Sequence, residues 1–249
     1  MSSAPQPDSG LSADKAALAA ELRADLARAR AMRAAARQSA ADQADRARLR
    51  AFQAERLART YSDLLASPRF GPAARFFLTD LYGAKDRAER DETLGNVVPI
   101  LSRMLPAGAV RGLAIAVRLD ALSEELDLAL LRALREGGGP GPEGLDAARY
   151  ARAWQRCGNR RERERQIELM MEAGQVLDRM TKIATVGIGL RLMRGPARAA
   201  GFGGVQDFLA RGFKAFAHMG DAAEFLGIIR TREAAFAERL FAGLPIDCA

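Results

Sequence analysis

Histidine and cysteine are almost absent from this sequence. Among its 249 residues are one histidine, His218, and two cysteines, Cys157 and Cys248, which form no CxxC pair. A single imidazole and two isolated thiols cannot supply a zinc site or the paired Glu-x-x-His motifs of a di-iron bundle. We therefore expect no metal, no cofactor and no His-dependent catalytic triad, and we expect both thiols to stay reduced.

Long apolar runs are also missing. The longest nearly apolar stretch, residues 183–193, contains Arg191 and is about half as long as a membrane-spanning helix. Residues 1–15 have no apolar centre and include Asp8 and Asp14, which is unlike a secretory signal or a transit peptide. The sequence predicts a cytoplasmic protein without a transmembrane segment.

Strand signals are lacking, whereas helix formers are abundant. Ala, Leu, Arg and Glu dominate, β-branched runs are absent, and no window alternates apolar and polar residues as a half-buried strand does. The expected fold is all-α, a multi-helix bundle-like domain preceded by a projecting N-terminal helical arm. We expect residues 1–12 to be disordered, 13–48 to form the Ala/Arg-rich arm, and 49–249 to form one domain.

One feature of the sequence sets the start of the domain, and another marks a linker within it. Residues 33–48 contain no apolar side chain larger than alanine, so a helix there would have little to bury. Residues 136–144 read EGGGPGPEG, a composition typical of a flexible linker between helical segments.

Aromatic residues are few, and many of them are clustered. Residues 61–82 hold Tyr61, Phe70, Phe76, Phe77 and Tyr82, and the next aromatic residue after these is at position 150. A second group lies at 202–241, where a helix starting near residue 205 would place its large apolar residues on one continuous face. Because large rings bury well, we expect the two groups to pack together and close the domain across the linker.

The block ARFFLTDLYG, which includes Phe76, Phe77, Leu78, Asp80 and Gly83, resembles that of a group of uncharacterised bacterial helical proteins with an FFLxDLYG-like motif. The resemblance covers roughly a tenth of the chain. It implies a bacterial, cytoplasmic, helical protein and carries no activity, cofactor or ligand.

Three carboxylates stand out on the predicted helix from residue 107 to about 135. Asp120, Glu124 and Asp127 share one side at i, i+4 and i+7. Such a ridge could bind a cation or serve as acid and base, but solvent exposure or pairing with arginines is the favoured interpretation, because the chain is rich in arginine. Glu233 borders an apolar stripe and would need a specific partner if buried.

The formal charge of +7 is unevenly spread, since residues 149–198 hold twelve basic and five acidic residues. Within this region, residues 149–165 interleave two aromatic rings with arginines, which suits phosphate contacts and stacking on bases. The spacing of Tyr150 and Trp154 fits a buried helical stripe equally well, and Cys157 among these cations could have a lowered thiol pKa. The candidate nucleic-acid or partner surface comprises Arg149, Arg152, Trp154, Arg156, Arg160 and Arg161.

No pattern in the sequence specifies a reaction, and no catalytic residue is predicted. The leading hypothesis is a non-enzymatic protein-interaction or regulatory module that binds a protein partner or a second copy of itself through the N-terminal arm. One alternative is a helical enzyme or sensor that binds a small apolar ligand near Phe76, Phe77 and Tyr82, with Asp80, Glu124 and Glu233 as further candidate site residues. The other alternative is nucleic-acid binding through residues 149–165.

Overall fold

The computed structural model describes residues 9–35, 39–81, 107–137, 144–201 and 203–244. Within these ranges the chain is helical and contains no strand, which confirms the all-α prediction. The elements are α1 (Ser9–Ala35), α2 (Ala40–Thr60), α3 (Ser62–Ala66), α4 (Gly71–Phe76), the π-helix η1 (Phe77–Leu81), α6 (Ala107–Glu136), α7 (Ala147–Cys157), α8 (Arg160–Thr181), α9 (Ala184–Leu192), α10 (Arg194–Ala199), α11 (Gly203–Met219) and α12 (Ala223–Phe241).

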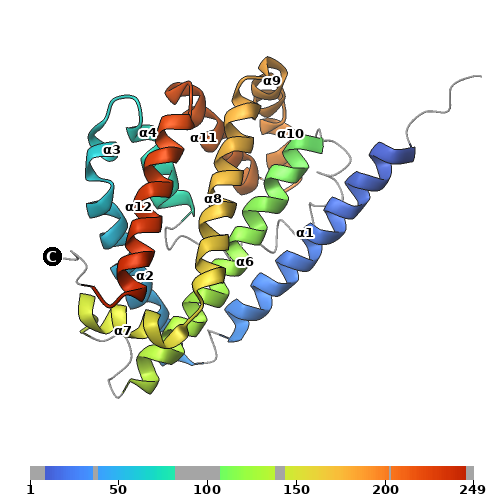
Figure 1. Ribbon diagram of the computed structural model, residues 1–249. Helices are drawn as coiled ribbons and strands as arrows, with labels where there is room; N and C mark the ends of the chain where they lie inside the picture. Colours follow the sequence, from blue (N-terminus) through green and yellow to red (C-terminus); the bar gives the residue numbers. More distant parts are fainter. Residues whose placement is uncertain (1–8, 36–38, 82–106, 138–143, 202, 245–249) are drawn as a thin grey trace, which may run out of the picture.

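Three long helices form the centre of the molecule. Helix α8 packs between α6 and α12, and the three run side by side (Figure 1). Short α7 contacts α6 and α12 at one end, while α9, α10 and α11 gather at the other end. Helix α4 packs on α11 and is joined through α3 to α2. The interior is therefore enclosed by helices that are distant in sequence.

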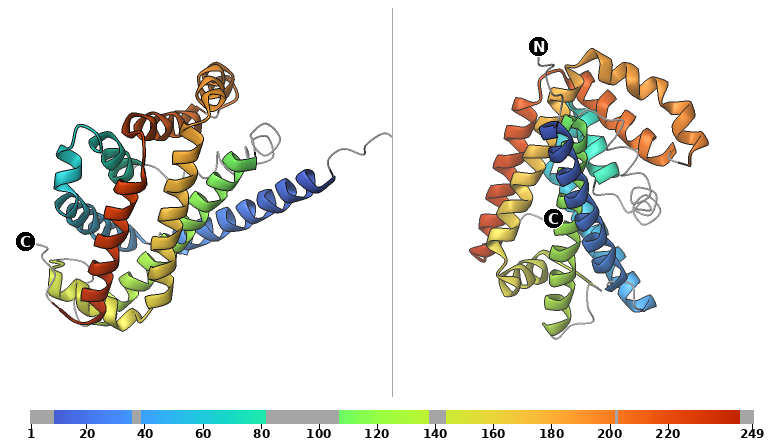
Figure 2. Two further views of the ribbon diagram at one scale, coloured as in Figure 1. Left: turned by 45° about the horizontal axis from the view of Figure 1, so that its top comes forward. Right: turned by 90° about the vertical axis from the view of Figure 1, so that its right-hand side faces the viewer.

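The N-terminal helix, expected to project as an arm, packs along α6 over much of its length. Leu22 and Leu26 of α1 are buried against Leu113 and Val117 of α6. Only the first turns of α1 extend past the bundle (Figure 2). The apolar stripe of this helix is thus occupied within the chain.

The two aromatic groups pack together in one core cluster, as the sequence predicts. The ring of Phe76 lies 5.4 Å from that of Phe208, and the ring of Phe70 lies 5.8 Å from that of Phe225, measured between centroids. Gly212 of α11 permits this approach, because a Cβ atom there would lie 2.8 Å from the Phe76 ring. The aromatic block therefore anchors α4 on α11 and α12.

A second cluster forms where α7 closes the opposite end. Tyr150 and Trp154 are buried there together with residues from α6 and α12. The Trp154 ring makes edge contacts with Phe236 and Phe241. Gly158, with φ of 60°, then ends α7 in the left-handed conformation that glycine adopts without strain. The chain turns directly from this glycine into α8, which brings residues of both helices to the interior.

Candidate functional site

Glu124 is a buried carboxylate at the centre of an arginine cluster. It lies on α6 and is 2% exposed. Arg33 of α1 donates to it at 3.2 Å, Arg50 of α2 donates at 2.5 Å, and Arg46 of α2 also donates to it. Burial of a carboxylate is costly unless charge and hydrogen bonds compensate, and three guanidinium groups supply both here.

The two neighbouring carboxylates of α6 extend this cluster in both directions. Asp120 accepts from Arg33 at 2.8 Å, and Asp127 accepts from the Gln53 amide at 3.0 Å. The Arg50 side chain also approaches Asp127, with 3.7 Å between Nε and Oδ2. The i, i+4, i+7 spacing thus places all three carboxylates toward partners from α1 and α2. Of the two outcomes favoured from the sequence, solvent exposure and pairing with arginines, the structure shows pairing.

Residues 33–48 bury more side chains than the sequence suggests. The expectation that this stretch has little to bury is wrong, because Arg33, Asp45 and Arg46 are all buried. Asp45 accepts from Arg135 near the end of α6 at 2.7 Å. The stretch docks by charge rather than by apolar side chains, and a hydrophobic-periodicity argument cannot detect such docking.

A second buried ion pair joins α2 to α12. Arg56 donates to Glu233 at 2.6 Å, and the Tyr61 hydroxyl donates to the same oxygen at 2.7 Å. Burial by itself lowers the pKa of Arg56, but the charge of Glu233 and its hydrogen bond outweigh burial and raise it. Arg56 also lies 4.3 Å from the centroid of the Phe236 ring. Glu233 therefore has the specific partner that its position on the apolar stripe requires.

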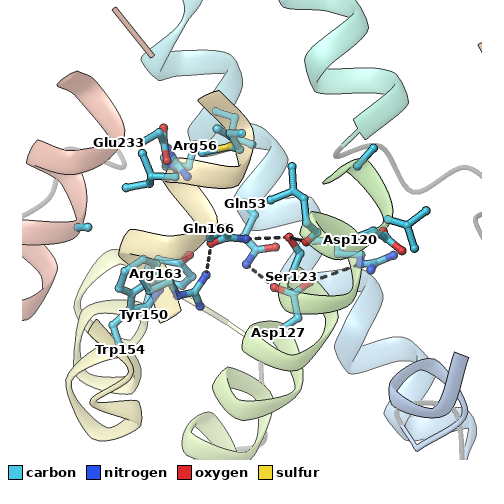
Figure 3. A pocket seen from close by; sticks show the side chains of 18 of the residues that line it. Gln53, Arg56, Asp120, Ser123, Asp127, Tyr150, Trp154, Arg163, Gln166 and Glu233 are labelled. Atoms are coloured by element: carbon cyan, nitrogen blue, oxygen red, sulfur yellow. Dashed lines mark hydrogen bonds and ion pairs between the residues drawn. The ribbon is translucent and has the colours of Figure 1, made fainter. Parts of the chain in front are cut away.

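A cavity of about 110 Å³ lies between these two ion-pair centres. It is bounded by six helices, α2, α6, α7, α8, α11 and α12, and Figure 3 shows its polar side chains. The charged and polar residues that line it are Arg50, Gln53, Arg56, Asp120, Ser123, Asp127, Tyr150, Trp154, Arg163, Gln166 and Glu233. Apolar residues line the remainder, most of them from α6, α8 and α11, with Leu57 of α2 and Ala237 of α12.

A chain of hydrogen bonds crosses the cavity between α8 and α6. Arg163 donates to the Gln166 side-chain oxygen at 3.2 Å, and the Gln166 amide donates to the Ser123 hydroxyl at 2.8 Å (Figure 3). Ser123 in turn donates to the Leu119 carbonyl at 2.8 Å. These hydrogen bonds hold Gln166 and Ser123 in place and tie α8 to α6 beside the cavity.

Two aromatic residues of α7 form the wall beside Arg163. The Arg163 guanidinium lies 4.1 Å from the centroid of the Trp154 ring. Burial raises the pKa of the Tyr150 hydroxyl, and the charges of Arg163 and Arg56 offset part of that rise. The indole N–H of Trp154 and the Gln53 side chain also lie near this hydroxyl, but the indole N–H has no acceptor in hydrogen-bonding geometry among the described residues.

Three lining side chains retain a buried donor without an acceptor in the described part of the chain. These donors are the Nε atoms of Arg50 and Arg56 and the Nε1 atom of Trp154. Arg56 is 8% exposed and Trp154 is 6% exposed. A buried donor without a partner is costly, and each such group in a folded protein calls for an explanation.

The aromatic residues expected to line a ligand pocket lie in the core instead. Phe76 and Phe77 are buried in the main cluster, and neither lines the cavity, although Phe208, which packs on Phe76, does. The Asp80 side chain and the whole of Tyr82 lie outside the described structure. Of the predicted ligand residues, Glu233 lines the cavity, and Glu124 forms an ion pair with the lining residue Arg50.

The predicted nucleic-acid surface is not one continuous patch. Trp154 points into the interior, so its ring is not available to stack on bases. Arg149 donates to the Gly144 carbonyl, Arg156 donates to the Ala133 carbonyl, and Arg160 pairs with Glu238. Arg152 and Arg161 are exposed. Most of these arginines therefore hold parts of this chain together.

The two remaining chemical candidates are Cys157 and His218. Burial raises the pKa of the Cys157 thiol, and the charge of Arg163 offsets this only in part, so the expectation of a lowered thiol pKa is wrong. His218 is exposed, as expected, and one ring nitrogen lies 3.0 Å from the Pro68 carbonyl.

In the described ranges, no group of acidic, cysteine or histidine side chains could hold a metal ion. Among the described helices, none is apolar over a length that could cross a bilayer.

The chain belongs to a family defined by a domain of unknown function, DUF8198, whose model matches residues 32–246. This agrees with the expectation of an uncharacterised family, while the block at 76–83 as its signature stays a prediction. Neither a search of curated proteins nor a search of solved structures gave a match.

Proposed function

We propose that this protein is a non-enzymatic regulatory module that senses a small molecule by binding it in the cavity between α2, α6, α7, α8, α11 and α12. The observation that carries the proposal is the set of buried, incompletely satisfied donors around one preformed cavity. Ligand sites are usually concave and largely preformed, with a few convergent polar groups. Strongly perturbed ionisable groups, such as Arg56 and Tyr150 here, are a further mark of functional sites.

The lining favours binding over catalysis. Ser123 is the only aliphatic hydroxyl among the lining residues, and it bonds to Gln166 and the Leu119 carbonyl rather than to a general base. A nucleophile needs a base within hydrogen-bonding reach. Glu233 and Asp127, which could act as bases, already accept from Arg56 and Gln53. The polar groups are therefore arranged to hold a molecule in place.

Trp154 is the only tryptophan in the chain and lines the cavity, so its fluorescence reports directly on occupancy. We expect native mass spectrometry of the protein from its own host to retain a small molecule. Adding that molecule to stripped protein should change the Trp154 emission saturably and raise the melting temperature, since a ligand that binds only the folded state stabilises it.

The matched test is a variant that fills the cavity. Ala116 of α6 lines the cavity, and Ala116→Leu adds a larger apolar side chain there. We expect it to remove binding while the protein stays folded. Arg152→Gln, on the exposed face of α7, should bind as the wild type does. Equal ligand binding by Ala116→Leu and the wild type would refute the cavity as the site.

Binding of a protein partner is the second candidate, and one surface favours it. Helix α9 has no buried residue, and Ile188 and Leu192 are 48% and 72% exposed. Arg191 and Arg194 lie beside them along an open hollow of about 770 Å³ between α9 and α11. A partner with apolar residues flanked by carboxylates fits this surface.

The α9 surface can be tested by comparing variants. A true partner should co-purify from the host with the wild type and with Arg152→Gln, and should be lost with Leu192→Glu. A set of co-purifying proteins that is identical for all three forms would remove this candidate. The arm-mediated partner binding expected from the sequence has less support, because Leu22 and Leu26 are already buried on α6.

A further inference from the structure

The open hollow between α9 and α11 lies at the end of the molecule opposite α7 (Figure 1). One side of each helix lines it. Its lining includes positions 187, 190 and 191 of α9 and positions 210, 213, 214 and 217 of α11. Each set follows helical spacing and therefore belongs to one side of its helix. The Gln206 side-chain amide donates to the Leu190 carbonyl at 2.7 Å and ties the two sides together.

The apolar part of the hollow combines two larger side chains with several small ones. Leu190 and Phe213 line it and are only partly buried. Gly187 lets the Phe213 ring lie against α9, because a Cβ atom there would be 3.0 Å from the ring. Ala210 and Ala217 also line the hollow, and their short side chains leave the α11 backbone within reach of a further helix.

The charged part of the hollow is basic on both sides. Arg191 of α9 and Arg194 at the start of α10 lie on one side, Lys214 of α11 lies on the other, and all three are exposed. Across the described ranges, none of the three forms an ion pair. The one carboxylate among the lining residues, Asp207, is paired with Arg198 at 3.4 Å. Charge complementarity therefore calls for an occupant with carboxylates on both flanks.

The shape of the hollow favours a helix as the occupant. Ridges of side chains pack into grooves between helices, and an amphipathic helix that lays its apolar side in a groove is a recurring mode of recognition. An extended peptide would need a sheet edge, and the described ranges contain no strand. The α11 lining from Gln206 to Ala217 spans roughly 16 Å at about 1.5 Å per residue, which is the length of about three helical turns.

Resting on the second candidate function, protein binding at the α9 surface, we propose that the partner contributes an acidic amphipathic helix of about three turns that lies between α9 and α11. Its apolar side packs on Leu190 and Phe213, and its Asp or Glu side chains pair with the cations on both sides of the hollow. Ile188 and Leu192, each one position from a lining residue of α9, extend the apolar contact beyond the hollow.

Three labelled synthetic peptides of about fourteen residues test the chemistry of the occupant. The acidic probe carries leucines on one side of a helix and glutamates on its flanks. The basic probe has lysine in place of each glutamate, and the scrambled probe keeps the acidic composition without an apolar side. Fluorescence anisotropy with the full-length protein should show saturable binding of the acidic probe, about ten-fold tighter than the scrambled one. Its affinity should fall as salt rises, and the basic probe should not bind.

Charge reversal locates the acidic probe. The double variant Arg191→Glu with Arg194→Glu should bind the acidic probe about ten-fold more weakly and should gain binding of the basic probe. Both residues are exposed, and the gained binding would show that the variant is folded. Arg152→Gln, on α7 at the opposite end of the molecule (Figure 1), should bind as the wild type does. Equal affinity of the double variant and the wild type for the acidic probe would overturn the proposal.

Two other anionic occupants are tested in parallel. Vesicles that contain phosphatidylglycerol present a negative bilayer surface, and a random-sequence DNA duplex presents phosphates. We expect neither to bind at physiological salt, because neither supplies an apolar ridge that fills the hollow. If vesicles or DNA bind the wild type, are released by the charge reversal, and the acidic probe does not bind, the surface recognises lipid or nucleic acid and the helix is wrong.

A crosslink separates this inference from the candidate function on which it rests. The photoreactive residue p-benzoylphenylalanine in place of Ala217, an exposed lining residue, should crosslink in host cells to the partner, and mass spectrometry identifies the attached segment. An acidic segment with helical apolar spacing supports the inference. A partner that is lost with Leu192→Glu but crosslinks through a segment without carboxylates, or not at all, keeps the candidate function and refutes the inference. If no partner depends on Leu192 and no probe binds, both fail.

Discussion

Removing the Glu124 carboxylate should cost a large part of the stability of this domain. Glu124→Leu replaces a 2% exposed carboxylate with an apolar group of similar size and leaves three arginine side chains, which are 4%, 7% and 13% exposed, in the interior. Two of them keep a carboxylate, since Arg33 still pairs with Asp120 and Arg50 still lies near Asp127. Breaking a buried pair from one side typically costs about 3–5 kcal/mol.

This magnitude is easy to resolve, because a typical domain is stable by only about 5–15 kcal/mol. Urea denaturation followed by Trp154 emission and far-ultraviolet circular dichroism gives the free energy of unfolding. Glu124→Gln keeps one oxygen acceptor but loses the charge, so its cost should fall between those of the wild type and Glu124→Leu.

The adjacent residue provides a matched control. Glu125 pairs with Arg28 of α1, but these side chains are 28% and 51% exposed. Exposed ion pairs contribute about 0–1 kcal/mol, so Glu125→Gln should change stability by no more than that. A cost for Glu124→Leu within this same range would refute the argument that the cluster stabilises the fold by compensating buried charge.

Partial recovery in a double variant would identify the cause of the loss. Replacing Arg46 with methionine in the Glu124→Leu background removes one of the buried cations that pair with Glu124 and keeps an apolar stem of similar length. We expect the double variant to be more stable than Glu124→Leu alone, because the uncompensated charge is what destabilises it. If Arg46→Met adds its full cost to that of Glu124→Leu, the two residues do not act as a pair.

Three further predictions concern other parts of the fold. Gly212→Ala should destabilise the protein by about 1–3 kcal/mol, because its Cβ would clash with the Phe76 ring. Gly227→Ala should stabilise it by about 0.5–1 kcal/mol, because a Cβ there meets open space. Urea denaturation measures both changes. Cys157 should react with iodoacetamide more slowly than a free cysteine at pH 8, because burial raises its thiol pKa. The hydrogen bond from Arg232 of α12 lowers the pKa of Asp63 to about 2. Asp63 should therefore contribute at most about 1 kcal/mol to the free energy of unfolding above pH 4. That contribution should vanish as pH falls through 2, so stability curves of wild type and Asp63→Asn should converge there.

The sequence predicts the helices and the aromatic core well, because both leave periodic apolar signals. The face running from Val205 through Phe208 and Gly212 follows helical spacing, and the structure packs it against the block at 70–77. The helix expected from residue 107 to about 135 is observed at 107–136. The periodic spacing of apolar residues within each helix is local in sequence, so a single sequence is enough to detect it.

The charged interior could not be located in the same way. The spacing of Asp120, Glu124 and Asp127 predicts a shared side, and it favours either solvent exposure or pairing with arginines without choosing between them. The partners, however, come from residues 33–50, which have almost no apolar signal and lie far from α6 in sequence. Which charged side chains pair depends on how α1 and α2 are aligned along α6. That alignment is set by three-dimensional packing, and a single sequence does not reveal it.

The cavity has no sequence signal of its own, because six helices leave it as they pack. The charged residues that line it nevertheless share one property, since all of them lie within residues 32–246, which the family model matches. The apolar residues that α1 adds, Leu22 and Leu26, precede that range and pack on Leu113 and Val117 from outside. Because Leu113 and Val117 also line the cavity, α1 supports an apolar part of its wall, and through Arg33 it also holds the lining carboxylate Asp120. The polar lining thus depends on residues of the matched region, while the apolar lining at Leu113 and Val117 also depends on how firmly α1 packs on α6.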